Sequence, residues 1–113
     1  MTPNKSQMPA TYHELDAYLG KQHARTIANN TTAERADDGP AIVVRLHGHE
    51  IARLWPRSVR VRDAGWQTPT TKDRLNRMLA PYGARIAQHE YQWYYESGRT
   101  RGPWYGEHVL ETD

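Results

Sequence analysis

The residues of this sequence best suited to bind a metal ion are His47 and His49. Side chains two residues apart on a strand point to the same side of a sheet, so two imidazoles could share one ion. Gly48 between them indicates a tight turn, however, and no third ligand follows at a fixed spacing. His89 and His108 could join them only through the fold. We therefore expect surface histidines beside a hairpin and no metal site.

Catalytic motifs are absent from the sequence. It contains no GxSxG, HExxH or phosphate-binding loop, and its serines stand in no motif context. It also contains no cysteine, which excludes a cysteine nucleophile, a disulfide and a thiolate metal site. We expect a non-enzymatic protein without catalytic residues or a cofactor. An acid–base site assembled from scattered His and Glu residues is the alternative.

Arginines form the most distinctive constellation in the middle of the chain. Residues 41–77 carry eight basic and three acidic residues, whereas the segments on either side are slightly acidic. The alternation in this segment places Arg45, Arg60 and Arg62 on one face of a predicted sheet. Such a face could bind phosphate groups. A solvated sheet face that binds nothing is the simpler interpretation.

A second candidate surface lies near the C-terminus, where arginines and aromatic residues are interleaved. Its members are Arg99, Arg101, Trp104 and Tyr105. This composition is typical of single-strand nucleic-acid binders and of protein-interface hot spots. Lys72 and Arg77 would form an auxiliary basic face on a helix.

The elements that must position these residues begin after a polar leader. Residues 1–10 are polar, contain two prolines and are expected to be a disordered leader to a single domain over residues 11–113. Thr11 and Glu14 have the spacing of a capping box, which predicts a short helix ending at Gly20. No apolar run is long enough for a membrane span, and we expect a protein of the cytoplasm that does not bind membranes.

Alternation of apolar and polar residues predicts several short strands. They lie within residues 25–36, 41–47, 51–55, 58–62, 84–95 and 104–111, with a turn at 37–40. Each of the segments 25–36 and 84–95 is predicted as one strand. We expect an α+β fold with an antiparallel meander of about four to six strands.

The segment GWQTPTTKDRLNRML, residues 65–79, predicts the central helix. Thr70 or Thr71 would cap it, and Trp66 before it is expected to pack in the core. Its apolar stripe consists of Leu75, Met78, Leu79 and Tyr82. We therefore expect this helix to dock on one face of the meander, leaving the arginine face open.

With these elements in place, residues 25–95 resemble a small protein encoded by many tailed bacteriophages and common in phages of actinobacteria. The resemblance is carried by NNT, by the strand VRLH, by the GW-T-TT-KDR-N stretch and by QWYY. This chain departs from the pattern at Thr32, at Pro56-Arg57 and at the single Gly65 before the tryptophan. The resemblance implies a phage source and a fold, but no established enzymatic activity and no active site.

Two functional hypotheses follow from these observations. The first is a non-enzymatic phage accessory protein that acts in the cytoplasm of the host bacterium and binds a host or phage protein to modulate or inhibit it. The alternative is nucleic-acid binding through the face of Arg45, Arg60 and Arg62. The sequence does not specify an oligomeric state.

Overall fold

The computed structural model describes residues 8–112. Its elements in chain order are α1 (Tyr12–Leu19), β1 (Ala24–Ala28), β2 (Thr31–Arg35), β3 (Ile42–Leu46), β4 (His49–Trp55), β5 (Ser58–Arg62), α2 (Pro69–Leu79), the 3-10 helix η2 (Ala80–Tyr82), β6 (Ala84–His89), β7 (Gln92–Ser97), β8 (Thr100–Pro103) and β9 (Glu107–Glu111). Residues 1–7 of the expected leader lie outside the described residues. Met8 and Ala10 belong to the buried core, so the packed part of the chain begins before Thr11.

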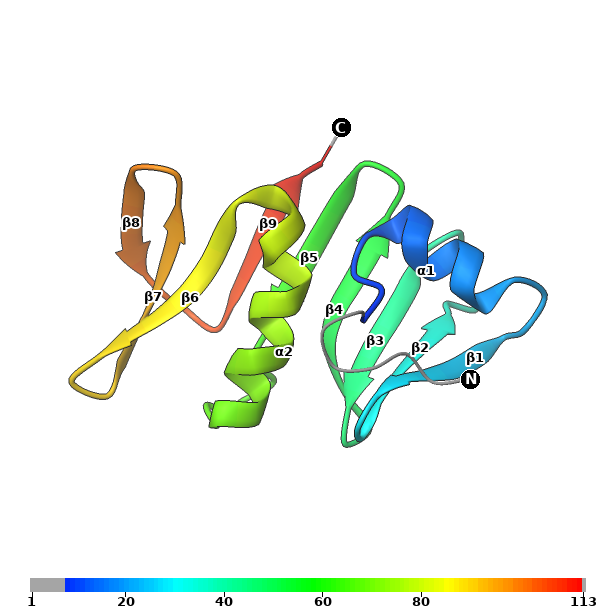
Figure 1. Ribbon diagram of the computed structural model, residues 1–113, viewed down its shortest axis with the longest axis horizontal. Coiled ribbons are helices and arrows are strands. Elements are labelled where there is room, and N and C mark those ends of the chain that lie inside the picture. The colour runs from blue at the N-terminus through cyan, green and yellow to red at the C-terminus, as the bar shows by residue number, and fades with distance from the viewer. Residues whose placement is uncertain (1–7, 113) are drawn as a thin grey trace.

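Six strands form one antiparallel sheet in the order β1-β2-β3-β4-β5-β9 (Figure 1). The first five follow one another as a meander, and β9 returns to pair with β5. Ile42, Val44 and Leu46 alternate along β3 and are buried, because they point to the side that the helices cover. The predicted α+β class with an antiparallel meander is confirmed.

Two segments that alternation predicts as single strands are hairpins. Residues 25–36 contain β1, β2 and a turn at Asn29-Asn30, while residues 84–95 contain β6, the start of β7 and a turn at Glu90-Tyr91. Positive φ angles close these turns: 53° at Asn30, 50° at Glu90 and 70° at Tyr91. Asparagine adopts this conformation readily, whereas Glu-Tyr carries no such signal.

The capping box predicted for α1 is confirmed. Thr11 Oγ1 accepts a hydrogen bond from the Glu14 amide at 3.1 Å, and Glu14 Oε1 accepts one from the Thr11 amide at 3.0 Å. The backbone hydrogen bond from Thr11 to the Glu14 carboxylate holds the pKa of this group below its usual value. Gly20 ends the helix with a φ of 56°, and Leu15 and Leu19 are buried beneath it.

Helix α2 begins earlier than predicted. Its cap is Thr68, not Thr70 or Thr71, because Pro69 occupies the first helical position, where the missing N–H costs nothing. Thr68 Oγ1 accepts a hydrogen bond from the Thr71 amide at 3.1 Å. The predicted apolar stripe is confirmed for its helical members, which are the fully buried Leu75, Met78 and Leu79.

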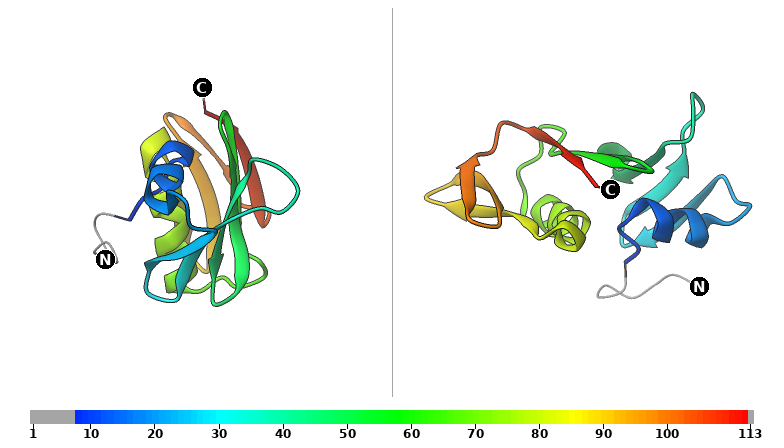
Figure 2. Two further views of the ribbon diagram at one scale, coloured as in Figure 1. Left: turned by 90° about the vertical axis from the view of Figure 1, so that its right-hand side faces the viewer. Right: turned by 90° about the horizontal axis from the view of Figure 1, so that it is seen from above.

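The helices and the remaining strands cover one side of the six-stranded sheet. Helix α1 packs on β2 and β3, and α2 packs on β4, β5 and β6 (Figures 1 and 2). Strands β6, β7 and β8 form a second sheet, in which Tyr95 stacks on His108 of β9 with ring centroids 3.9 Å apart. No helix within residues 8–112 is long and apolar enough to span a membrane.

Candidate functional site

The arginine face predicted from the sequence exists, and we call it the outer face: the side of the six-stranded sheet opposite α1 and α2. Arg45 forms an ion pair with Glu34 on the neighbouring strand β2. Arg60 Nη2 lies 2.8 Å from Glu50 Oε2, and Arg53 Nη2 lies 3.1 Å from the other oxygen of the same carboxylate. Arg45 and Arg60 therefore contact carboxylates of neighbouring strands, and Arg53 contacts a carboxylate of its own strand, β4.

These contacts neutralise the outer face. Strand register places four arginines and four glutamates on it: Arg45, Arg53, Arg60 and Arg62, with Glu34, Glu50, Glu107 and Glu111. Burial disfavours the charged form of Glu50, but hydrogen bonds from Arg53 and Arg60 outweigh this effect and lower its pKa. A phosphate group approaching this face would compete with carboxylates that are already bound.

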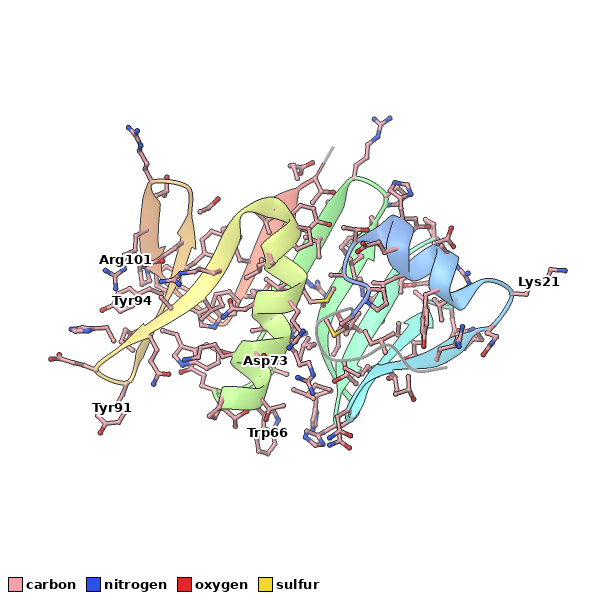
Figure 3. All side chains as sticks on the ribbon, viewed as in Figure 1. Lys21, Trp66, Asp73, Tyr91, Tyr94 and Arg101 are labelled. Atoms are coloured by element: carbon pink, nitrogen blue, oxygen red, sulfur yellow. The ribbon has the colours of Figure 1, made fainter. Side chains whose placement is uncertain are left out.

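The predicted surface of aromatic residues and arginines near the C-terminus does not form as one surface, because one of its members is buried and the others are exposed. Trp104 is buried, with 4% of its surface exposed, and its indole N–H donates to Asp63 Oδ2 at 2.8 Å, so its assignment to a binding surface is wrong. Tyr105 beside it is 85% exposed. Arg99 is exposed in the turn between β7 and β8. Arg101 lies over the Tyr94 ring, with its guanidinium carbon 4.3 Å from the ring centroid (Figure 3).

The basic residues of α2 form hydrogen bonds with other side chains of the same protein. Lys72 Nζ donates to Gln88 Oε1 at 3.0 Å, and Arg77 Nε donates to Asp73 Oδ2 at 3.0 Å. Arg74 is buried and donates to the Thr31 hydroxyl at 2.9 Å. In the predicted auxiliary face, Lys72 therefore connects α2 to β6, whereas Arg77 is paired with Asp73 inside the helix itself.

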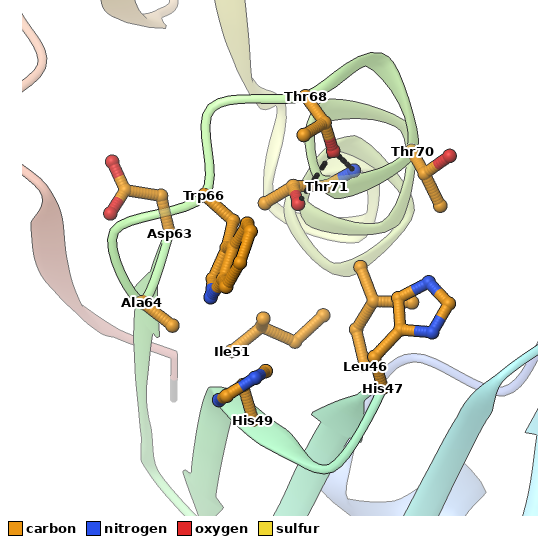
Figure 4. A pocket seen from close by; sticks show the side chains of 10 residues that line it. All are labelled: Leu46, His47, His49, Ile51, Asp63, Ala64, Trp66, Thr68, Thr70 and Thr71. Carbon is orange, nitrogen blue, oxygen red and sulfur yellow. Dashed lines mark hydrogen bonds between the residues drawn. The ribbon is translucent and has the colours of Figure 1, made fainter.

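His47 and His49 line a largely apolar cavity with a volume of about 390 Å3. The cavity lies between the β3–β4 turn, the loop from β5 to α2 and the first turn of α2 (Figure 4). Apolar side chains and alcohols complete its walls: Leu46, Ile51, Ala64, Trp66, Thr68, Thr70 and Thr71.

Trp66 stands exposed at the side of this cavity. Its surface is 55% exposed, so the expectation that it packs in the core is wrong. The His49 ring lies against it, with ring centroids 5.6 Å apart and planes inclined by 37°. The Trp66 amide donates to the Asp63 carbonyl at 2.9 Å, so a hydrogen-bonded turn fixes the backbone that carries the indole.

Asp63 organises this turn from a buried position. Its carboxylate accepts hydrogen bonds from the Gly65 amide at 2.8 Å, the Gln67 side chain at 3.1 Å and the Trp104 indole at 2.8 Å. The turn itself contains left-handed residues, with φ of 55° at Ala64 and 83° at Gly65. The loop that presents Trp66 is thus preorganised by one buried acid.

His47, His49 and Asp63 line one cavity. An acid–base site would require histidine and acidic side chains to lie together in this way. The Asp63 carboxylate nevertheless faces the N–H donors of its own loop, and Trp66 lies between it and the histidines (Figure 4). Within residues 8–112, no group of three His, Asp or Glu side chains is arranged to hold a metal ion. The geometry favours a binding cavity over a catalytic one.

Three segments without a charged residue lie at this end of the molecule, two of them lining the cavity, and together we call them the uncharged end. They are residues 29–32, 47–49 and 64–71, which contain no Lys, Arg, Asp or Glu. The His47 amide donates to the Asn30 carbonyl at 2.9 Å, which joins the first two segments. All three lie at the end of the molecule where α2 begins (Figure 1).

Comparison with known proteins gives one finding. No significant match was found among curated proteins or solved structures. The family model described as Kyanoviridae Gp96 protein matches residues 8–111, which is nearly the whole chain. The match confirms the predicted phage origin, while the narrower expectation of an actinobacterial phage stays a prediction. The chain belongs to the Kyanoviridae Gp96 family of phage proteins.

Proposed function

We propose that this phage protein is a non-enzymatic accessory protein that binds a host or phage protein through its uncharged end. Binding would modulate or inhibit the partner in the cytoplasm of the host. The single observation that carries the proposal is the exposed Trp66, held by a rigid loop beside an apolar cavity. Centres of protein interfaces are depleted in charged residues and often contain an exposed tryptophan as an anchor; the uncharged end contains no Lys, Arg, Asp or Glu and presents Trp66.

The energetics of Trp66 support this use. A tryptophan buries about 200 Å2 when it is fully enclosed, so roughly half of that area is left for a partner to cover. At about 25 cal/mol per Å2, covering it would contribute roughly 2–3 kcal/mol, the size of an interface hot spot. Because the loop is held by Asp63, little conformational entropy is lost when a partner binds.

The alternative, nucleic-acid binding through the outer face, has weaker support. Three arginines of that face, Arg45, Arg53 and Arg60, contact carboxylates, and the face carries four arginines and four glutamates. Affinity for a phosphate backbone comes from cations that are free to replace its counterions. A mobility-shift titration tests this alternative: binding that weakens steeply between about 50 and 200 mM salt would favour it over protein binding.

An affinity pull-down from host lysate tests the proposed function. Because residues 25–95 resemble proteins of actinobacterial phages, lysates of such bacteria are the first to use. The wild type and an Arg62→Gln variant of the outer face should retrieve the same protein, and a Trp66→Ala variant should lose it. Failure to retrieve any protein reproducibly, or equal retrieval by all three, would contradict the proposal.

A further inference from the structure

We propose that the cavity beside Trp66 is an anchor pocket for one aromatic side chain, tyrosine or tryptophan, of the partner protein. The inference rests on the proposed function and adds the chemistry of the residue that is recognised. Three properties of the cavity carry it: its size, the arrangement of its walls and the absence of a free charge in its lining.

The size of the cavity suits a single side chain. Its volume of about 390 Å3 lies near the lower end of the range of about 300–1,000 Å3 typical of small-molecule sites. A dinucleotide or a larger cofactor needs the upper part of that range. One large aromatic side chain from a neighbouring protein surface fits inside a cavity of this size.

The walls of the cavity suit a ring. Trp66 and His49 stand on one side, His47 and Thr70 stand on the other, and Ile51 lies between them at the base (Figure 4). Aromatic pairs prefer offset or edge-to-face arrangements with centroids about 4.5–7 Å apart. A third ring inserted here would meet the indole and imidazole in such arrangements while its far edge contacts Ile51.

The polar groups of the walls favour an uncharged aromatic side chain that carries an O–H or N–H group, such as tyrosine or tryptophan. The two imidazoles and the Thr70 hydroxyl can pair with a phenol O–H or an indole N–H. Asp63 is the one acidic residue of the lining, and its carboxylate accepts hydrogen bonds from Gly65, Gln67 and Trp104. A lysine, arginine or acidic side chain would lose its hydration here without gaining a counter-charge.

A nucleobase is the competing planar occupant, and the charge distribution disfavours it. A base arrives with phosphates, and the uncharged end contains no lysine or arginine to receive them. Of the basic residues on the adjoining helix α2, Lys72 donates to Gln88, and Arg74 and Arg77 are paired with Asp73. We therefore assign the pocket to a protein side chain and treat the nucleobase as an outcome of the test.

The test is a titration of the isotopically labelled full chain with small probes, followed by amide chemical shifts in NMR spectra. The probes are N-acetyltryptophanamide, N-acetyltyrosinamide, N-acetylleucinamide, N-acetyllysinamide and adenosine monophosphate. Saturable shifts confined to residues 46–51 and 63–71 are expected with the two aromatic amides and not with the other three. Equal shifts with leucine or lysine amide, or stronger shifts with the nucleotide, would overturn the inference.

Matched variants locate the binding. Thr70 is exposed at the rim, so a Thr70→Phe variant should fill the cavity without disturbing the core and abolish the shifts. Thr100→Phe makes the same substitution at an exposed threonine of β8 and should bind like the wild type. Spectra of each variant without probe confirm its fold, and Trp66→Ala provides a second variant. Unchanged binding by folded Thr70→Phe would overturn the inference.

The two proposals can fail separately. A partner that depends on Trp66 in the pull-down, with no saturable shift from either aromatic amide, overturns the anchor pocket and leaves the proposed function standing. Aromatic amides that bind at the pocket support the inference even where the lysate yields no partner. Self-association that broadens the pocket signals and is abolished by Thr70→Phe would mean that a second copy is the occupant and would overturn the inference.

Discussion

The outer face and the uncharged end use their side chains in opposite ways. The outer face contains many ionisable groups, but Arg45, Arg53 and Arg60 pair with Glu34 and Glu50, so that the face presents little unbalanced charge. The uncharged end contains no Lys, Arg, Asp or Glu in its three segments, yet it leaves an indole half-exposed beside a cavity. The comparison shows that the density of charge in a sequence is a poor guide to where a protein has binding capacity left.

Two tryptophans of the same region give the largest expected contrast. Trp104 is buried and bonded to Asp63, so Trp104→Ala should lower the free energy of unfolding by about 4 kcal/mol. Trp66 is half-exposed, so Trp66→Ala should lower it by less than about 1 kcal/mol. Urea unfolding followed by circular dichroism measures both. Equal losses would mean that Trp66 belongs to the core after all.

The next largest loss in the free energy of unfolding is expected from removal of the buried Asp63 carboxylate. Asp63→Ala leaves three N–H donors without their acceptor and should cost roughly 3 kcal/mol in urea unfolding. Asp38→Ala is the matched control, because Asp38 is exposed and lies 3.7 Å from Arg53; it should change stability by less than about 0.5 kcal/mol. Comparable effects of the two variants would contradict the role assigned to Asp63.

Removing two glutamates from the outer face should leave its arginines without these carboxylate partners and allow the face to bind single-stranded DNA. The double variant Glu34→Gln/Glu50→Gln removes the carboxylates that contact Arg45, Arg53 and Arg60. It should lose roughly 2 kcal/mol of stability and gain single-stranded DNA binding at about 50 mM salt that disappears at about 200 mM. Mobility shifts measure the gain. A wild type that binds as well as the variant would remove the distinction between the two surfaces.

The smallest expected effect is a pH dependence at the junction of the two sheets. Burial lowers the pKa of His108 from its usual 6.5, so the unfolded chain takes up this proton first as the pH falls. The free energy of unfolding should therefore decrease as the pH drops below about 6.5. His108→Gln should weaken this dependence between about pH 6.5 and 5, above the range in which Glu14, Glu50 and Asp73 protonate, since their pKa values are lowered. An unchanged slope would contradict the assignment.

The fold was largely predictable because its signals are local. The alternation in residues 41–62 specifies the meander, and the Thr11–Glu14 spacing specifies the cap of α1. The hairpin at Glu90-Tyr91 was not predictable, because neither residue type indicates a positive φ. Its strands are held by partners across the sheet, which a single segment of sequence does not reveal.

The candidate site was less predictable for the same reason. The spacing of His47 and His49 indicates at most a weak metal candidate beside a hairpin, whereas the cavity that they line depends on a loop more than ten residues away. The pairing of Arg60 with Glu50 follows from strand register, which alternation leaves open. Trp66 was placed in the core because tryptophan is usually largely buried. The one available signal was the absence of charge in residues 29–32, 47–49 and 64–71.

The central claim is that the uncharged end, and not the outer face, binds the partner. The most direct test is a titration of the protein retrieved from host lysate against the wild type, Trp66→Ala and Arg62→Gln. We predict that Trp66→Ala weakens binding by about 30-fold, corresponding to about 2 kcal/mol, and that Arg62→Gln changes it by less than about threefold. Full affinity of Trp66→Ala together with a large loss in Arg62→Gln would contradict the claim.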